Sequence, residues 1–178
     1  TGAERTGISP DVAERVGAKM VASTLTAGVG SPNWRRVGLA TVSRLELGSL
    51  RVRNVPVAVR NTAFGGAPRW QGESLSPLSL GLSVEVDYPR RRVTFARSLA
   101  EGPAAIRLPM RFHRLPLVRG TVNARHAAAF VVDTGGEVIS LSAETAAELA
   151  IPPGVRRIPL RLFGLSGRDT SAFLLPGL

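Results

Sequence analysis

The chain has 178 residues, which is enough to bury a core in one large domain or in two small ones. It contains no cysteine, so disulfide scaffolds, thiolate metal sites and cysteine nucleophiles are excluded. The formal net charge of +10 comes almost entirely from arginine and would attract phosphate groups or anionic lipid. The arginines are scattered, however, and no aromatic pairs accompany the tightest run, Arg90-Arg91-Arg92, so we expect no nucleic-acid partner.

The composition favours short strands over long helices. Nineteen Gly and 13 Pro divide the chain into short segments, and we therefore expect a mostly β fold with short helices. No apolar run approaches the roughly 20 residues that cross a bilayer, so we expect no membrane segment in this chain. The first residue is not Met, which indicates processing, and a signal removed upstream would direct the protein to the periplasm or to secretion.

The first predicted element is a short helix over residues 10–16. Ser9 can cap it, Pro10 occupies the favoured first helical position, and Gly17 lies just past its end. The helix is too short to stand alone and is expected on the outside of a sheet.

Strands follow the helix. Residues 45–52 and 55–59 alternate apolar residues with polar or small ones, and turns are expected at residues 48–49 and 53–54. Residues 82–86 and 92–95 predict a hairpin across the loop 87–90. Its core-facing side chains are expected to be Val84, Val86 and Val93.

The middle of the chain suggests a boundary between two units. Residues 98–107 have no clean hydrophobic period and are interpreted as a linker. The predicted division is therefore a first lobe over 1–97 and a second lobe over 108–178.

The second lobe begins with two strands and ends with a hairpin. Residues 117–122 and 128–132 predict strands, and the second strand runs directly into Asp133. Ser142 can cap a helix over residues 143–149, which two prolines then stop. Residues 158–163 and 170–175 flank a Gly-rich tip that could close over a ligand, formed by Gly164, Leu165, Ser166 and Gly167.

An internal repeat relates the two lobes. Thr1-Gly2-Ala3-Glu4 aligns with Thr134-Gly135-Gly136-Glu137 at an offset of 133 residues, and the match continues without a gap through the two predicted helices. Two units of one kind are therefore expected, the first interrupted by the start of the chain and the second by its end.

The segment around Asp133 resembles the active-site segment of retropepsin-like aspartic proteases. An apolar strand precedes Asp133-Thr134-Gly135-Gly136, and an apolar step and an Ala-rich helix follow it. Thr1-Gly2-Ala3 looks like the same segment without its aspartate, and the strands of residues 45–59 and 82–95 look like later strands of such a lobe. The resemblance implies two acid-protease β lobes, both truncated.

The resemblance also implies a mechanism. A pair of carboxylates at the lobe junction would share one proton, so that the charged member activates water and the protonated member polarises the peptide carbonyl. Asp133 would be catalytic, Thr134 would brace the two turns, and Gly135 would allow their close approach. No metal or other cofactor is implied.

Two alternatives remain open at this point. Asp133 could serve only as an Asx-turn residue before Gly135. The protein could also be a catalytically silent module that binds a peptide in the cleft, by adding a strand under the Gly-rich hairpin.

Two residues depart from the family pattern, and the two histidines have no evident metal-ligand partners in the sequence. Glu73 and Ser74 stand where the family usually has two apolar residues beside the active-site turn, so support or activity of the first lobe is expected to be altered. His113 and His126 are far apart in sequence and have no carboxylates nearby in sequence, so we expect surface or linker histidines rather than metal ligands.

The functional expectation is an aspartic-type endopeptidase acting on a peptide or protein substrate. The repeat places the position before Thr1 opposite Asp133, and we expect Asp there in the parent protein. The 178-residue chain itself holds one Asp-Thr-Gly and is expected to be inactive as a monomer. A second carboxylate would come from the pseudo-symmetric first lobe or from a second copy in a homodimer.

Overall fold

The computed structural model describes residues 2–28, 34–60, 73–100, 102–103, 106–136, 138–149, 151, 154–164 and 167–175. The fold is mostly β, as the sequence predicts, with short helices. The elements of the first half are β1 (Thr6–Ile8), α1 (Pro10–Arg15), β2 (Lys19–Thr26), β3 (Arg35–Leu47), β4 (Leu50–Val59), the 3-10 helix η2 (Leu78–Leu80), β5 (Ser83–Asp87) and β6 (Arg92–Ala96). Those of the second half are β7 (Met110–Phe112), β8 (Pro116–Val122), β9 (His126–Val131), α2 (Ala143–Glu148), β10 (Ile158–Pro159), β11 (Leu162–Gly164), β12 (Gly167–Asp169) and β13 (Phe173–Leu174).

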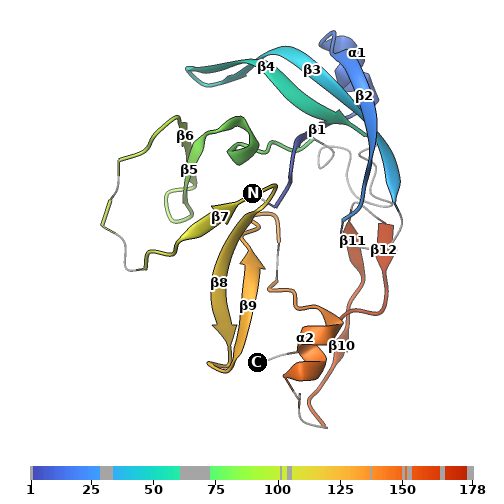
Figure 1. Ribbon diagram of the computed structural model, residues 1–178, viewed down its shortest axis with the longest axis vertical. Helices are drawn as coiled ribbons and strands as arrows, with labels where there is room; N and C mark the ends of the chain where they lie inside the picture. The colour runs from blue at the N-terminus through green and yellow to red at the C-terminus, as the bar shows by residue number, and fades with distance from the viewer. Residues whose placement is uncertain are drawn as a thin grey trace.

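A four-stranded sheet organises the first half, in the order β1-β4-β3-β2. β1 runs parallel to β4, with Thr6 opposite Val57, and the other pairs are antiparallel. The sheet and α1 lie at one end of the molecule, and β8, β9, α2 and β10 lie toward the other (Figure 1). The turn at residues 48–49 is confirmed, with Gly48 at φ +61°, where a side chain would be strained.

The predicted turn at residues 53–54 is wrong. β4 continues through both residues, and Arg53 pairs with Arg44 on β3. Asn54 does adopt φ +53°, a conformation that Asn tolerates better than most residues, so the local signal was real. Pairing with β3 on both sides of Asn54 keeps the strand intact.

The core described by the structure lies in the first half. Ala40, Val55 and Val57 form a buried cluster, with Ile8 and Leu80 packed against it. Burial of such side chains is the main stabilising term for the sheet. In the second half Pro116 is fully buried, whereas Val138 and Ile139 expose 47% and 86% of their surface.

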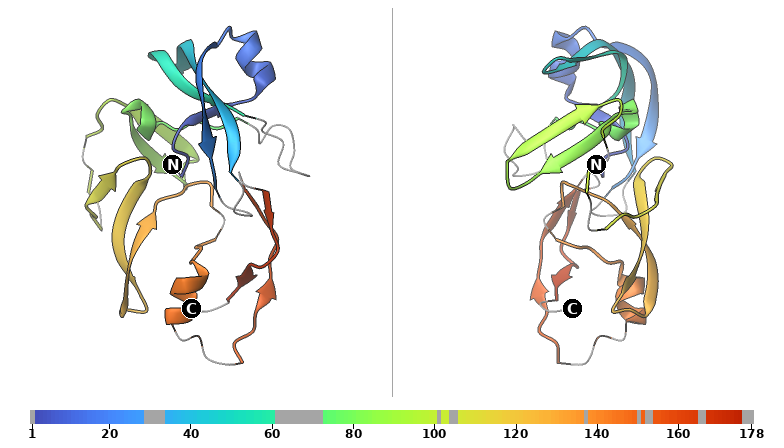
Figure 2. Two further views of the ribbon diagram at one scale, coloured as in Figure 1. Left: turned by 45° about the vertical axis from the view of Figure 1, so that its right-hand side comes forward. Right: turned by 90° about the vertical axis from the view of Figure 1, so that its left-hand side faces the viewer.

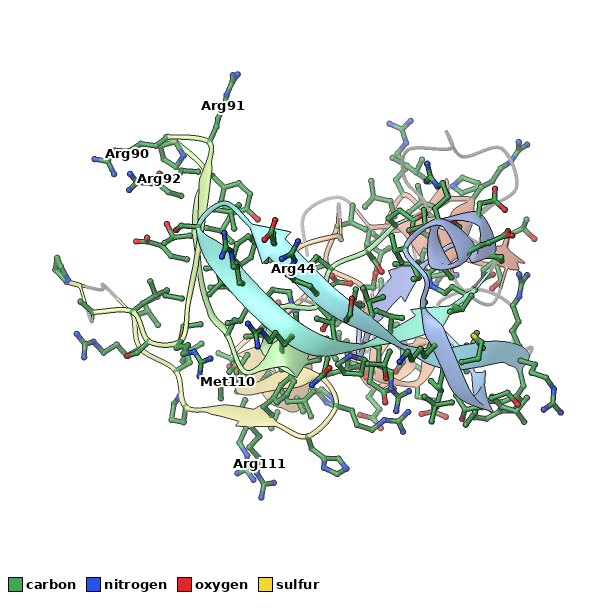
Figure 3. All side chains as sticks on the ribbon, turned by 90° about the horizontal axis from the view of Figure 1, so that it is seen from above. Arg44, Arg90, Arg91, Arg92, Met110 and Arg111 are labelled. Atoms are coloured by element: carbon green, nitrogen blue, oxygen red, sulfur yellow. The ribbon has the colours of Figure 1, made fainter. Side chains whose placement is uncertain are left out.

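The hairpin β5–β6 is confirmed, with Asp87 Oδ1 accepting a hydrogen bond from the Arg90 N–H at 2.9 Å in its loop. Val84 and Val86 are partly buried. Val93 is 50% exposed, so its predicted place in the core is wrong, since the hairpin forms a two-stranded sheet by itself. Arg90, Arg91 and Arg92 cluster at its tip, where Arg91 projects outward (Figure 3).

The second half contains a three-stranded sheet in the order β7-β8-β9 and a broken hairpin. β10 pairs with β13, and β11 pairs with β12 up to Gly164 opposite Gly167, which confirms the hairpin that the sequence predicts. The hairpin β11–β12 extends from the second half toward the first (Figures 1 and 2).

The repeat is visible in local geometry. α1 and α2 each have six residues and begin 133 residues apart. Ser9 and Ser142 cap them with nearly the same backbone conformation, φ −71°, ψ 159° and φ −67°, ψ 155°. Both predicted helices are therefore confirmed, each ending one residue earlier than expected. Among the described residues no helix is long and apolar enough to cross a membrane.

Candidate active site

Asp133 lies where the two repeated turns meet. Its Oδ1 accepts a hydrogen bond from the Gly135 N–H at 2.9 Å, within its own turn, and another from the Gly2 N–H at 3.2 Å. The first bond is the Asx-turn contact expected for Asp before Gly. The second joins residues 131 positions apart in the chain, so the carboxylate does more than form a local turn.

The approach of the two turns requires glycine. A Cβ added at Gly2 would overlap the Asp133 carboxyl group, with even the farthest of its three atoms, Oδ1, only 2.5 Å away. A Cβ at Gly135 would lie 3.4 Å from the same Oδ1. Gly2 is therefore needed for close approach to Asp133 rather than for an unusual backbone angle.

β9 carries Asp133 to this position. The N–H of Val132 donates to the Pro116 carbonyl oxygen at 2.9 Å, which extends the contact between β8 and β9 to the residue before Asp133. Pro116 is fully buried and anchors the start of β8. Asp133 itself is exposed, as are Thr134, Gly135 and Gly136, so the carboxylate can meet a ligand from solvent.

Ser76 supports the segment that contains Gly2 through hydrogen bonds to Ala3 and Thr6. Its hydroxyl donates to the Ala3 carbonyl oxygen at 2.6 Å, and its N–H donates to Thr6 Oγ1 at 3.1 Å. Ser76 is 1% exposed, and burial strengthens the requirement that both groups be paired. Sequence analysis missed this residue because a lone serine between Leu75 and Pro77 carries no signal.

An ion pair joins the two halves beside the turns. Arg114 donates from a terminal guanidinium nitrogen to Glu4 Oε2 at 2.6 Å. This hydrogen bond holds the pKa of Glu4 below its ordinary value, while partial burial opposes the shift. Arg114 adopts φ +124°, a conformation rare for a residue with a side chain, so local strain accompanies the contact.

Glu73 and Ser74, the two polar residues at positions where the family usually has apolar ones, both form hydrogen bonds. Glu73 Oε2 accepts a hydrogen bond from the Ser9 N–H at 2.9 Å, at the start of α1. Ser74 exchanges two backbone hydrogen bonds with Gly7, of 2.8 and 3.0 Å, and its hydroxyl accepts one from Arg60 at 3.2 Å. Burial lowers the pKa of the Arg60 guanidinium, and the charge of Glu73 opposes that shift. Glu73 and Ser74 thus support β1 and α1 instead of packing as apolar residues.

Three of the predicted site residues, Thr1, Leu165 and Ser166, lie outside the described residues. Gly164 and Gly167 pair with each other at the end of β11 and β12, where the Gly-rich tip begins. The structure thus brings together Gly2 and Asp133 through a hydrogen bond. Gly164 and Gly167 are not among the described hydrogen-bond partners of either residue.

The premise that the histidines lack a nearby carboxylate does not hold for His126. His126 has a carboxylate partner, because its Nε2 lies 3.2 Å from Glu148 Oε2 at the end of α2. The pair lines an open hollow of about 600 Å³ together with Asn123, Arg125 and Leu149. This hollow does not include Asp133. Within the described part of the chain no three His, Cys, Asp or Glu side chains group as metal ligands would.

Residues 1–84 match the family model described as aspartyl protease. This part of the chain is similar to aspartyl proteases. The match begins at Thr1-Gly2-Ala3, of which Gly2 contacts Asp133, and includes Ser76 and β1 to β4. Asp133 lies outside the matched residues, so its relation to the family rests on the repeat. No curated protein and no solved structure was found to match the chain.

Proposed function

We propose that Asp133 is one carboxylate of an aspartic dyad that hydrolyses peptide bonds with an activated water. The observation that carries the proposal is the pair of hydrogen bonds to its Oδ1, one from Gly135 and one from Gly2. Backbone N–H groups from two repeated turns thereby fix one carboxylate at the junction of the turns. The match of residues 1–84 to the aspartyl protease family model supports the same chemistry.

The reaction divides between two carboxyl groups. Ionised Asp133 takes a proton from a water molecule as the water oxygen attacks the peptide carbonyl carbon. A second, protonated carboxyl group donates its proton to the carbonyl oxygen, which gives a tetrahedral intermediate with two hydroxyl groups. Asp133 then passes the proton taken from water to the amide nitrogen as the C–N bond breaks, and one hydroxyl group of the intermediate returns a proton to the second carboxylate. The repeat puts that second group at the position before Thr1, opposite Asp133.

Other residues have supporting roles in this proposal. Thr134 and Gly136 shape the turn of Asp133, and Thr1, Gly2 and Ala3 form the matching turn. The hairpin tip from Gly164 to Gly167, with Leu165 and Ser166, closes over a bound peptide and excludes water. The division into a first lobe over 1–97, a linker over 98–107 and a second lobe over 108–178 is part of the same proposal.

The source of the second carboxyl group determines whether the active form is a monomer or a dimer. A single Asp-Thr-Gly per chain cannot supply both the base and the acid, so the 178-residue chain is inactive as a monomer under this proposal. Two copies could instead bring their Asp133 residues together around a two-fold axis, which would make activity depend on concentration.

The test uses the chain with one Asp added directly before Thr1, which we call the Asp-extended protein. It should cleave a mixture of unstructured peptides at mildly acidic pH, and pepstatin should inhibit the cleavage. Asp133→Asn in that protein should remove activity without changing the circular dichroism spectrum, because an amide cannot exchange the proton. Undiminished cleavage by the Asn variant would place catalysis elsewhere, and absence of cleavage with retained peptide binding would identify a catalytically silent module.

A further inference from the structure

A row of exposed apolar side chains leads into and along β7. Ile106 exposes 76% of its surface, Leu108 57%, Met110 50% and Phe112 46%. The four residues are spaced two apart, and successive side chains of an extended strand point to opposite faces, so Met110 and Phe112 share one face of β7. We call Ile106, Leu108, Met110 and Phe112 the apolar row.

Arginines alternate with the apolar row. Arg107 and Arg111 occupy intervening positions, and Arg111 projects from β7 on the side opposite to Met110 (Figure 3). Residues 102–132 contain five arginines, two histidines and no Asp or Glu. One of the five, Arg114, is already paired with Glu4, but the remaining charge around β7 is positive. The electrostatic complement of this surface is acidic.

β7 is also an edge strand. It pairs with β8, with Met110 opposite Val118 and Phe112 opposite Pro116, and the strand order of the described residues places nothing on its other side. An edge strand leaves N–H and C=O groups free to pair with another extended chain. The positive charge of Arg111 at the edge disfavours pairing with an apolar or basic strand and favours pairing with an acidic one.

We propose that the outer edge of β7 binds an extended polypeptide segment in which apolar and acidic residues alternate. Main-chain hydrogen bonds add the segment to the sheet, its apolar side chains pack on the apolar row, and its carboxylates face Arg107 and Arg111. A membrane surface fits less well, because the strand directs Met110 and Arg111 to opposite faces. The interaction does not require Asp133 and is independent of the proposed catalysis.

The probe is a fluorescent peptide of about ten residues, the length of a long strand, in which Val and Glu alternate. Its fluorescence anisotropy is measured on titration with the 178-residue chain. Two comparison peptides are used: one with the same composition in separate Val and Glu blocks, and one in which Val and Lys alternate. The alternating Val–Glu peptide should bind at least about tenfold more tightly than either.

Two substitutions test whether the peptide binds at β7. Arg111→Glu should weaken binding of the Val–Glu peptide by at least about tenfold. Arg91→Glu makes the same charge change at the tip of the β5–β6 hairpin, on another part of the surface (Figure 3), and should leave binding unchanged. Circular dichroism checks that both variants fold, and the three-peptide comparison on the unaltered chain does not depend on either variant.

Several results would overturn the proposal. Equal binding of the block peptide would exclude strand addition, and equal loss of affinity in both variants would indicate non-specific attraction by net charge. Binding to vesicles rich in phosphatidylserine without binding to the peptide would assign the surface to a membrane. Sedimentation showing a dimer that Arg111→Glu dissociates, without peptide binding, would assign the edge to a second copy of the chain.

Discussion

Gly2→Ala tests the contact on which the active-site geometry depends. The added Cβ would overlap the Asp133 carboxyl group, whose Oδ1 would lie 2.5 Å away, and ordinary contacts of this kind are about 1 Å longer. The carboxylate or the turn must therefore move by about 1 Å, and the hydrogen bond from Gly2 is strained or lost. A displacement of this size in a catalytic group costs about 100-fold in rate, or about 2.7 kcal/mol of transition-state stabilisation.

The assay is kcat/KM of the Asp-extended protein on a cleaved peptide, with thermal unfolding measured in parallel. Gly102→Ala is the matched control, because a Cβ at Gly102 meets no atom of the described residues within 4 Å, and it should retain full activity. The expected result is a loss of about 100-fold for Gly2→Ala with the fold intact. Activity within about threefold of the parent, in a folded Gly2→Ala protein, would refute the claim that close approach of the two turns positions Asp133.

Three further outcomes follow from the structure. Glu4→Gln should lower the melting temperature at neutral pH. Because Arg114 depresses the pKa of Glu4 below 4.5, the difference in melting temperature from the parent should vanish as the pH falls through that lowered pKa. A difference that stays constant with pH would contradict the pairing of Glu4 with Arg114. Val55→Ala should reduce the free energy of unfolding in urea by about 2 kcal/mol, since Val55 is 2% exposed, and a change under about 0.5 kcal/mol would question the core. Gly167→Pro should break its pairing with Gly164 and lower peptide affinity and turnover together, whereas an unchanged KM would argue against a closing role for this hairpin.

Local signals in the sequence predicted local structure well. Ser9 and Ser142 cap helices because a serine hydroxyl satisfies a free N–H of the first turn, a rule that needs no tertiary information. The hairpins were likewise predictable from their turns and alternating strands. The repeat in the sequence alone relates the turn of Gly2 to the turn of Asp133.

Longer-range structure could not be predicted in this way. β2 and the first part of β3 were missed, because Gly38 and polar residues interrupt the alternation, and pairing between the two strands stabilises them instead. A Cβ at Gly38 would lie 2.5 Å from the Met20 methyl carbon, so the glycine reflects packing across strands rather than a turn. The Glu4–Arg114 pair spans 110 residues and depends on how the two halves meet, which no local pattern encodes.

The most direct test of the central claim compares turnover by two versions of the chain, extended before Thr1 by Asp or by Asn. The account predicts pepstatin-sensitive cleavage by the Asp-extended protein at a rate per molecule that does not change with protein concentration. The Asn-extended protein should be inactive, or active only as concentration drives pairing of two Asp133 residues. Equal, concentration-independent turnover by both proteins would contradict a dyad formed by Asp133 and a carboxylate on the opposite turn.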